Sequence, residues 1–475
     1  MDVHITLGPV GDRADRMYRQ LSDAIIEGRL RAGEALPPTR ELAAQLGVSR
    51  TTVTVAYDRL LSEGFTVARP GAGTFVAPSR SSVPLRRAPR GGAVRPRPPW
   101  LGESALPGRQ TPAAYDFAAG LPDPRLFPLE KWRRAVAHEL RPGAAVLGGY
   151  SQAEGYPPLR AAIARHIGLA RAVRAGEDDV IVTSGAQQAF DLVARVLVSP
   201  GDIVAVEEPG YPPVRALFQS YGAKVVGVPV DENGIVVAGI PSRARLVYTT
   251  PSHQFPTGAR MSLERRRELL EWAAAAGGLV IEDDYDSEYR YGERSLDPLQ
   301  SLDRSGRVVY VGTFSKTLLP GLRVGFLVAP EALHAALAGA KRLVDWHTET
   351  VTQAALARLI DDGSFAAHVR KAGRIYADRR ARLLEAVEAN LAPWVRIRPS
   401  VAGLHVFAEF VPGFPVPGDR LTGAALSEGV GIQSMHSFAR SATPRVGLVL
   451  GFGIIDAEHI AAGIHRLAGV MSRLA

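Results

Sequence analysis

The lysine at position 316 stands out by its type and by its place at the end of an apolar run. The chain holds five lysines and fifty-one arginines, so a lysine here suggests chemistry that arginine cannot perform. A primary amine can lose its proton and condense with an aldehyde, whereas a guanidinium stays protonated. The alternative is an ordinary surface lysine.

A second apolar run, residues 278–285, ends in carboxylates and a phenol. Together with Lys316, these groups match what a pyridoxal phosphate pocket needs. Lys316 would bind the cofactor as an internal aldimine, Asp283 would keep the pyridine nitrogen protonated, and Tyr285 could donate a hydrogen bond to the ring oxygen. Two other readings of the acidic cluster remain open, namely a solvated loop and a divalent-ion site.

The phosphate of such a cofactor needs hydrogen-bond donors and positive charge. Residues 184–187 form a turn after a short apolar run and open a helix whose N-terminal amides would face the phosphate. Ser315 and Arg323 flank Lys316. Tyr211 could stack on the ring. The predicted phosphate-binding residues are Ser184, Gly185, Ala186, Gln187, Ser315 and Arg323.

Short β-branched runs alternate with helical or loop stretches from residue 116 onward. Runs that are apolar on both faces favour an α/β fold with a mainly parallel sheet covered by helices. In such sheets the chemistry lies at the strand ends, where Asp283, Lys316 and the turn at Ser184 fall. The predicted strands contain residues 180–182, 203–206, 225–230, 246–248, 279–281, 308–311 and 324–328.

Composition sets the class of protein. At 475 residues with 46% hydrophobic residues, the chain can bury a large core in two to four domains. It has no cysteine, which excludes disulfides and thiolate metal sites. With neither an export signal nor a long apolar span, the expected location is the cytoplasm.

The first part of the chain is basic and shows the pattern of a winged helix. Residues 1–112 hold sixteen Arg and ten acidic residues, which favours a polyanionic partner. Apolar residues recur at helical spacing, Thr39 could cap a second helix, and Ser49 could cap a third helix with Val53, Tyr57, Leu60 and Leu61 on one face. Residues 65–76 alternate around a Gly-rich turn, as a wing does.

Residues 12–78 resemble the GntR-type winged helix. The motifs that carry the resemblance are 28–33, 36–43, 47–53 and 63–76. The resemblance implies binding to double-stranded DNA, with Arg50 reading bases and the threonines docking on phosphates. The implied contact residues are Arg40, Ser49, Arg50, Thr51 and Thr52, with Gly71 and Gly73 in the wing. An ordinary three-helix core with solvated Arg and Thr is the alternative.

Residues 79–115 form a predicted linker. Between Arg80 and Arg109 there are seven Arg, six Pro and one acidic residue, without apolar periodicity. Pro-rich chain is extended and semi-rigid. Its arginines could add nonspecific DNA affinity or simply keep the linker solvated.

Residues 116–475 resemble the fold-type I pyridoxal phosphate enzymes of the aspartate aminotransferase superfamily. The resemblance is carried by residues 117–123, 150–155, 183–185, 208–211, 256–258 and 315–323, and by Asp283 with Tyr285. It implies a smaller C-terminal α+β subdomain beside the main sheet. With its GntR-type head, the whole chain is identified as a member of the MocR-type transcriptional regulators.

The resemblance also implies a head-to-tail homodimer in which Tyr150 reaches the phosphate of the neighbouring subunit. Two positions depart from the enzymes. Phe255 stands where transaminases carry an asparagine that bonds the ring oxygen, so His253 or Gln254 could substitute. Val449 stands where they carry the arginine that clamps the substrate carboxylate, a role for which Arg445 is the candidate replacement.

Two functions follow from these observations. In the favoured one, the chain is a DNA-binding regulator that senses an amino compound, or pyridoxal phosphate itself, through an aldimine at Lys316. In the other, it is a working aminotransferase with an accessory DNA-binding head. The missing arginine argues against turnover of standard amino acids.

Overall fold

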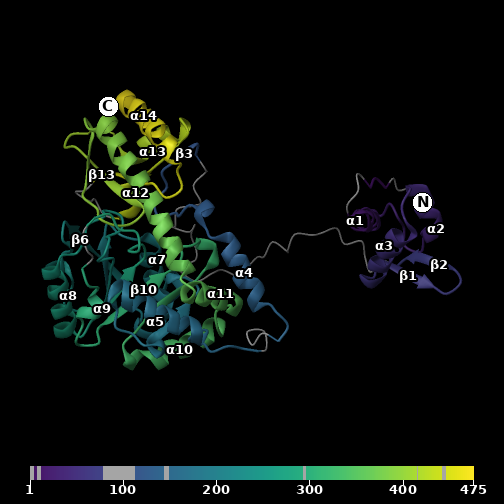
Figure 1. Cartoon of the computed structure of the whole chain (residues 1–475), viewed down its shortest axis with the longest axis horizontal. Helices are drawn as coiled ribbons and strands as arrows, with labels where there is room; N and C mark the ends of the chain where they lie inside the picture. Colours follow the sequence, from purple (N-terminus) through teal and green to yellow (C-terminus); the bar gives the residue numbers. More distant parts are fainter. Residues whose placement is uncertain are drawn as a thin grey trace. The chain divides into compact units, whose positions relative to one another are not determined.

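The computed structural model describes residues 5–7, 12–78, 113–143, 149–292, 296–414, 416–440 and 446–474. The chain divides into two compact units, Met1–Arg95 and Pro96–Ala475, which we call the head and the body (Figure 1). Of the predicted linker 79–115, residues 79–112 lie outside the described residues. No helix in the described part of the chain is long and apolar enough to cross a membrane.

The head is a winged helix, as predicted. Met17, Leu21, Val53 and Leu60 are fully buried between three helices and a two-stranded antiparallel wing. Ser49 caps the third helix by accepting a hydrogen bond from the Thr52 amide at 3.2 Å. The elements are α1 (Arg13–Ile26), α2 (Thr39–Leu46), α3 (Arg50–Ser62), β1 (Thr66–Arg69) and β2 (Gly73–Val76).

Two local expectations for the head were wrong. Thr39 does not cap α2, because it is already the first helical residue and its hydroxyl accepts a hydrogen bond from Arg50 Nε at 3.2 Å. Leu61 does not share the buried face of α3, since 42% of it is exposed. Successive residues on a helix are rotated by about 100°, and this rotation takes Leu61 past the edge of the face that buries Leu60.

The body is built on an eight-stranded mixed sheet of order β4-β11-β10-β9-β8-β5-β6-β7. The strands from β10 to β6 in this order are parallel, and the pairs at both ends are antiparallel. Six of the seven predicted runs lie wholly in these strands, and the seventh, 324–328, begins one residue before β11. The strands are β4 (Val180–Thr183), β5 (Ile203–Glu208), β6 (Lys224–Asp231), β7 (Gly234–Ile235), β8 (Ala244–Thr249), β9 (Leu279–Asp284), β10 (Val308–Thr313) and β11 (Gly325–Val328).

Helices cover both faces of this sheet because successive strand residues point to opposite sides. In β10, Val309 and Val311 pack against α6, α7 and α10, whereas Tyr310 packs against α5 and α11 on the opposite face. Helix α8 covers that opposite face farther along the sheet. The helices of this part are α4 (Leu129–Glu139), α5 (Pro157–Arg171), α6 (Ala186–Leu197), α7 (Pro212–Ser220), α8 (Leu263–Ala276), α9 (Leu299–Leu302), α10 (Glu331–Asp345) and α11 (Thr350–Asp361).

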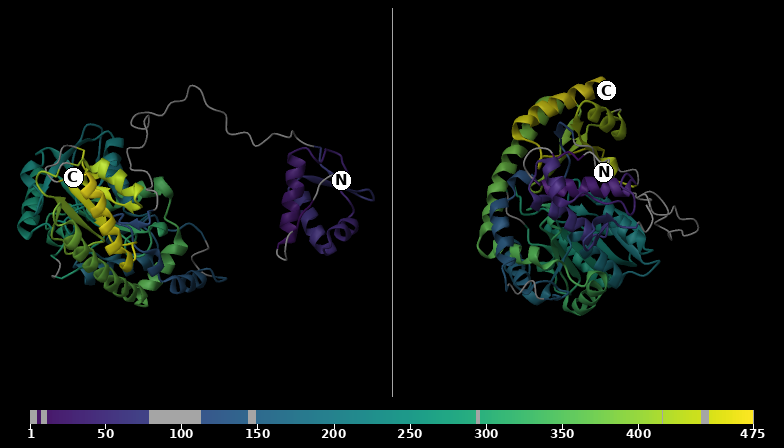
Figure 2. Two further views of the ribbon diagram at one scale, coloured as in Figure 1. Left: turned by 90° about the horizontal axis from the view of Figure 1, so that it is seen from above. Right: turned by 90° about the vertical axis from the view of Figure 1, so that its right-hand side faces the viewer.

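A smaller α+β subdomain follows, as the resemblance implied. Its antiparallel sheet has the order β12-β13-β16-β15, and Figures 1 and 2 show helices α12, α13 and α14 beside it. The short strand β3 (Tyr115–Asp116), from the start of the body, pairs in parallel with β14 of this subdomain. The remaining elements are α12 (Ser364–Leu391), β12 (Val395–Ile397), β13 (His405–Phe410), α13 (Gly418–Ser427), β14 (Val430–Gly431), β15 (Gln433–Ser434), β16 (Gly447–Gly451) and α14 (Ala457–Leu474).

Candidate functional site

Lys316 lies three residues after β10 and lines a cavity of about 330 Å³. Its Nζ donates a hydrogen bond to the backbone carbonyl of Gly120 at 2.7 Å. Burial lowers the pKa of the Lys316 amine, and the nearby carboxylates of Asp286 and Asp283 oppose that shift. A larger share of the amine is therefore neutral than in water, which is the nucleophilic form.

Asp283 lies in the same cavity, near the end of β9. Its Oδ2 accepts a hydrogen bond from the Tyr248 hydroxyl at 2.6 Å, while its Oδ1 is buried without a partner among the described residues. Burial, reinforced by Asp284 and Asp286 and opposed by the Tyr248 hydrogen bond and by Lys316, raises the pKa of Asp283 to about 7. An unpaired buried oxygen is costly, and a protonated ring nitrogen would both pair it and keep it ionised. The cavity therefore fits the predicted pyridine cofactor.

The other carboxylates at the end of β9 have their own partners. Glu282 accepts hydrogen bonds from two backbone amides at the start of α9, both at 2.9 Å. Asp284 forms a buried ion pair with Arg171 at 2.7 Å, and Asp286 contacts His253. The reading of the cluster at 282, 283, 284, 286 and 288 as a solvated loop was wrong, because the first four acidic side chains are buried and Glu288 is only partly exposed.

The end of the cavity where the phosphate is predicted to lie is built from the turn before α6. Gly185 is the N-cap of α6 with φ +77°, and a Cβ there would stand 2.6 Å from Arg323 Nη2. Arg323 Nη2 donates to the carbonyl of Ser184 at 2.7 Å. The predicted residues Ala186, Gln187, Ser315 and Arg323 line the cavity. First-turn amides and a guanidinium are the kinds of donor that a phosphate dianion needs.

The ring end of the cavity is aromatic. Tyr285, Tyr211 and Phe255 line it, and the rings of Tyr211 and Phe255 meet edge to face at 5.9 Å. Neither His253 nor Gln254 lines it, contrary to the expectation that one of them replaces the asparagine of transaminases. The Gln254 amide donates instead to Glu207 and to two backbone carbonyls.

Several lining residues escaped the sequence analysis. Tyr248, which holds Asp283, could have been suspected from its place at the end of an apolar run. Gly120 lies in the run 117–123, which supports the family resemblance but had no predicted role in the site. Gln433 and Phe438 come from the smaller subdomain, and no local pattern marks them.

Besides His253 and Gln254, four described positions that the sequence analysis named for this site are absent from the cavity lining, namely Tyr150, Ser184, Gly185 and Val449. Tyr150 is 84% exposed and packs beside Trp346, with ring centroids 5.3 Å apart. Val449 is fully buried in β16, where it packs with Phe407, Met435 and Phe438. Arg445 lies outside the described residues. Among the described lining residues the one arginine is Arg323, at the phosphate end.

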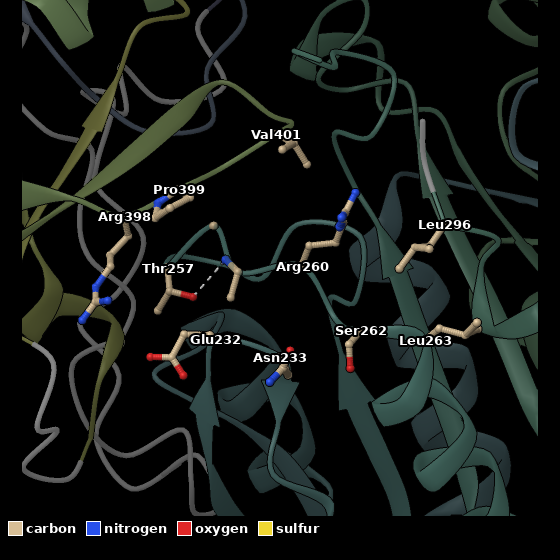
Figure 3. Close-up of a pocket in the computed structure, with 12 residues that line it drawn as sticks. Glu232, Asn233, Thr257, Arg260, Ser262, Leu263, Leu296, Arg398, Pro399 and Val401 are labelled. Atoms are coloured by element: carbon tan, nitrogen blue, oxygen red, sulfur yellow. Dashed lines mark hydrogen bonds between the residues drawn. The ribbon is translucent and has the colours of Figure 1, made fainter. Parts of the chain in front are cut away.

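A second cavity, of about 490 Å³, lies between the two parts of the body. Figure 3 shows Thr257 between Arg398 and Arg260, with Pro399 and Val401 above them. Its described lining holds no lysine, and it lacks an unpaired buried carboxylate. The cavity around Lys316 is therefore the stronger candidate for covalent chemistry.

The head presents the predicted contact residues on its surface. Arg40, Ser49, Arg50 and Thr51 are exposed, and Thr52 is partly exposed. In the wing, Gly71 and Gly73 have φ angles of +75° and +111°, conformations that favour glycine. The Ser49 hydroxyl is engaged in capping α3, so Arg50 and Thr51 are better placed to meet a partner.

Comparisons with known families match the two units separately. Residues 13–76 match the family described as bacterial regulatory proteins, gntR family. Residues 116–442 match the family described as aminotransferase class I and II.

Relatives of the whole chain are regulators by name. The chain is 38% identical over 459 residues to the probable rhizopine catabolism regulatory protein MocR of Rhizobium meliloti, covering 95% of this chain and 92% of the relative. It is 31% identical over 443 residues to the pyridoxine biosynthesis regulator PdxR of Corynebacterium glutamicum, covering 93% and 92%.

The body alone is similar to enzymes. It is 35% identical over 374 residues to the 2-aminoadipate transaminase of Thermus thermophilus, covering 77% of this chain and 92% of the enzyme. The α-aminoadipate aminotransferase LysN of that organism, solved with N-(5'-phosphopyridoxyl)-L-leucine, superposes with a TM-score of 0.68 at 35% identity, covering 76% and 92%.

Proposed function

Because the chain belongs to the MocR-type regulators, which join a gntR-family head to an aminotransferase class I and II body, we propose that it is a transcriptional regulator whose body senses an amino compound or pyridoxal phosphate itself. The observation that carries the proposal is that the Lys316 amine and the unpaired Oδ1 of Asp283 lie in the same cavity. The same chain also carries a DNA-binding head.

The cofactor is pyridoxal phosphate, and five side chains are proposed to hold it. When bound, it supplies an aldehyde that reacts with amines and a ring that accepts electrons. Lys316 provides the attaching amine, Asp283 pairs with the ring nitrogen, and Tyr285 donates to the ring oxygen. Tyr211 packs against the ring, and Arg323 with the first amides of α6 binds the phosphate.

The arrangement favours sensing over turnover. The position at which aminotransferases carry their carboxylate clamp holds Val449, which is buried against Met435 and Phe438. Without a clamp among the described lining residues, a bound amino acid would be poorly oriented for proton transfer. A ligand that replaces Lys316 on the cofactor would bind one of two states of the dimer more tightly than the other. This difference in affinity would shift the population toward the favoured state.

Fold-type I bodies are typically dimeric, and the surface offers apolar residues for such a contact. Tyr150, Trp346 and Leu343 are 84%, 55% and 88% exposed. We propose that they are covered in a head-to-tail homodimer, in which Tyr150 reaches the phosphate of the neighbouring site. Since its target is double-stranded DNA, the protein is proposed to act in the cytoplasm.

The test is a titration of the intergenic DNA upstream of the gene, with and without pyridoxal phosphate, for the wild type and Lys316→Ala. The cofactor should change the DNA affinity of the wild type and leave that of the variant unchanged. Equal affinities in all four titrations would contradict the sensor.

Catalysis is the second candidate, favoured by the 35% identity to a transaminase. The loaded protein would then convert an amino acid and a keto acid at roughly 1 to 1,000 turnovers per second. Formation of the lysine-linked cofactor without such turnover, together with a shift in DNA affinity, would support the regulator.

A further inference from the structure

His253 lies next to the cofactor cavity without lining it, and it contacts one residue that does. The side chain is 2% exposed. Its Nδ1 is 3.0 Å from the Tyr285 hydroxyl oxygen and 3.1 and 3.2 Å from the two carboxylate oxygens of Asp286. Its Nε2 is 3.1 Å from Ser400 Oγ, which belongs to the smaller subdomain. His253 thus joins Tyr285 to two anchoring side chains.

The chemistry of these groups decides where the hydrogens lie. An ionised carboxylate can only accept, so Nδ1 of His253 must carry a hydrogen toward Asp286. The Tyr285 oxygen that contacts the same nitrogen is then also an acceptor. The hydroxyl hydrogen of Tyr285 then has two acceptors within reach, the Asp286 carboxylate and, once the cofactor is bound, its ring oxygen.

Packing keeps the imidazole ring in this orientation. A Cβ at Gly403 would stand 2.2 Å from Cε1 of His253, and one at Gly258 would stand 3.3 Å from Nε2. The ring of His405 lies on another side, with centroids 4.7 Å apart. These neighbours leave little room for the ring to rotate.

A metal ion is a less suitable explanation for this cluster. His253, Asp286 and His405 bring three possible ligand atoms within 4.8 Å of one another. However, both oxygens of Asp286 lie at direct hydrogen-bond distance from Nδ1 of His253, so an ion between them would require the two side chains to separate. The hydrogen-bonded arrangement needs no such movement.

We propose that His253, anchored by Asp286, is a positioning residue that orients the Tyr285 hydroxyl as a donor to the ring oxygen of the cofactor. This rests on the proposed attachment of the cofactor at Lys316. It assigns to His253 an indirect part of the role that the asparagine of transaminases performs directly, since Phe255 at that position has no polar side chain.

The consequence is a change in the acidity of the nitrogen that links Lys316 to the cofactor. A hydrogen-bond donor stabilises the ionised ring oxygen of the cofactor. This stabilisation is larger when the linking nitrogen carries no proton, because a protonated nitrogen already neutralises the charge on the oxygen. Losing the donor should therefore raise the pKa of the linking nitrogen. The charged or titratable groups facing His253 are Asp286, Tyr285 and His405, and Asp286 also acts on Lys316.

The experiment is a pH titration of the visible absorbance band of the full-length, cofactor-loaded protein. His253→Phe should raise the midpoint by about one pH unit. His253→Asn, whose amide nitrogen can stand near the place of Nδ1, should keep the midpoint near that of the wild type. His465→Phe, at an exposed position of α14, is the matched control and should not shift it.

Borohydride reduction and peptide mass measurement establish that Lys316 carries the cofactor in each variant. An unchanged midpoint in His253→Phe, with the cofactor on Lys316, overturns the proposal. Stoichiometric bound metal in the wild type that is lost in His253→Asn overturns it as well. A wild type that never attaches the cofactor refutes instead the proposed function on which the inference rests.

Discussion

The ε-amine of Lys316 donates a hydrogen bond to the backbone carbonyl of Gly120, 2.7 Å away and 196 residues earlier in the chain. Gly120 has φ +72°, and a Cβ there would stand 3.3 Å from the amine. The segment that enters the body after the linker therefore holds the amine expected to attach the cofactor. Attachment would replace this hydrogen bond, so the segment and the cofactor compete for the same nitrogen.

Replacing Gly120 by alanine should weaken attachment of the cofactor. The left-handed backbone costs a non-glycine residue about 1–2 kcal/mol, and the added methyl group approaches the amine. We expect a lower melting temperature and a higher cofactor concentration for half-saturation. Gly339→Ala, in α10 with open space around the Cβ, is the control: it should leave the half-saturation concentration unchanged and should not lower the melting temperature, because alanine favours a helix.

Replacing Lys316 by alanine should abolish the covalent link to the cofactor. Borohydride treatment of the loaded wild type should add the mass of the reduced cofactor to the peptide containing Lys316. Lys371→Ala, at an exposed position of α12, is the matched control and should remain labelled at Lys316. Labelling of another lysine in the wild type would contradict the assignment.

Asp283 should make the stability of the cofactor-free protein fall as the pH rises. The pKa of this carboxyl is raised from 3.8 to about 7 in the folded chain, so the folded state binds its proton more tightly than the unfolded state does. The contribution of Asp283 therefore falls as pH rises from about 4 to about 7.

Asp283→Asn removes this titration and provides the comparison. The melting temperature of the variant relative to the wild type should be higher at pH 8 than at pH 4. Adding pyridoxal phosphate should stabilise the wild type more than the variant at pH 8, since only the carboxylate pairs with the ring nitrogen. A difference between the two proteins that does not change with pH would refute the raised pKa.

Replacing Arg50 by alanine should weaken specific DNA binding. A bidentate arginine–guanine pair is worth about 1–3 kcal/mol of discrimination, roughly a 5- to 150-fold change in affinity. The Nε bond to Thr39 orients the Arg50 side chain before DNA arrives. Arg19→Ala, at an exposed position of α1, is the control in a gel-shift titration, and both variants should keep the wild-type cofactor spectrum. An unchanged affinity of Arg50→Ala would exclude it as a reader.

The sequence predicted the features that depend on local pattern. The strands were found because β-branched runs are apolar on both faces, and the capping of α3 by Ser49 because its hydroxyl and the Thr52 amide are three residues apart. Contacts between distant segments could not be predicted in this way. Gly120 reaches Lys316 through its backbone, which no side-chain type reveals, and His253 meets Ser400 across 147 residues.

The short pairing of β3 with β14 has a practical consequence for protein engineering. The amide of Tyr115 donates to the carbonyl of Gly429 at 3.0 Å, and that of Phe117 to Gly431 at 2.8 Å. Residues from Tyr115 to Gly120 thus belong structurally to the body, although the sequence analysis placed Tyr115 at the end of the linker. A chimera that exchanges heads between relatives should be joined before Ala113. A later junction would place residues of the other protein in the proposed cofactor site.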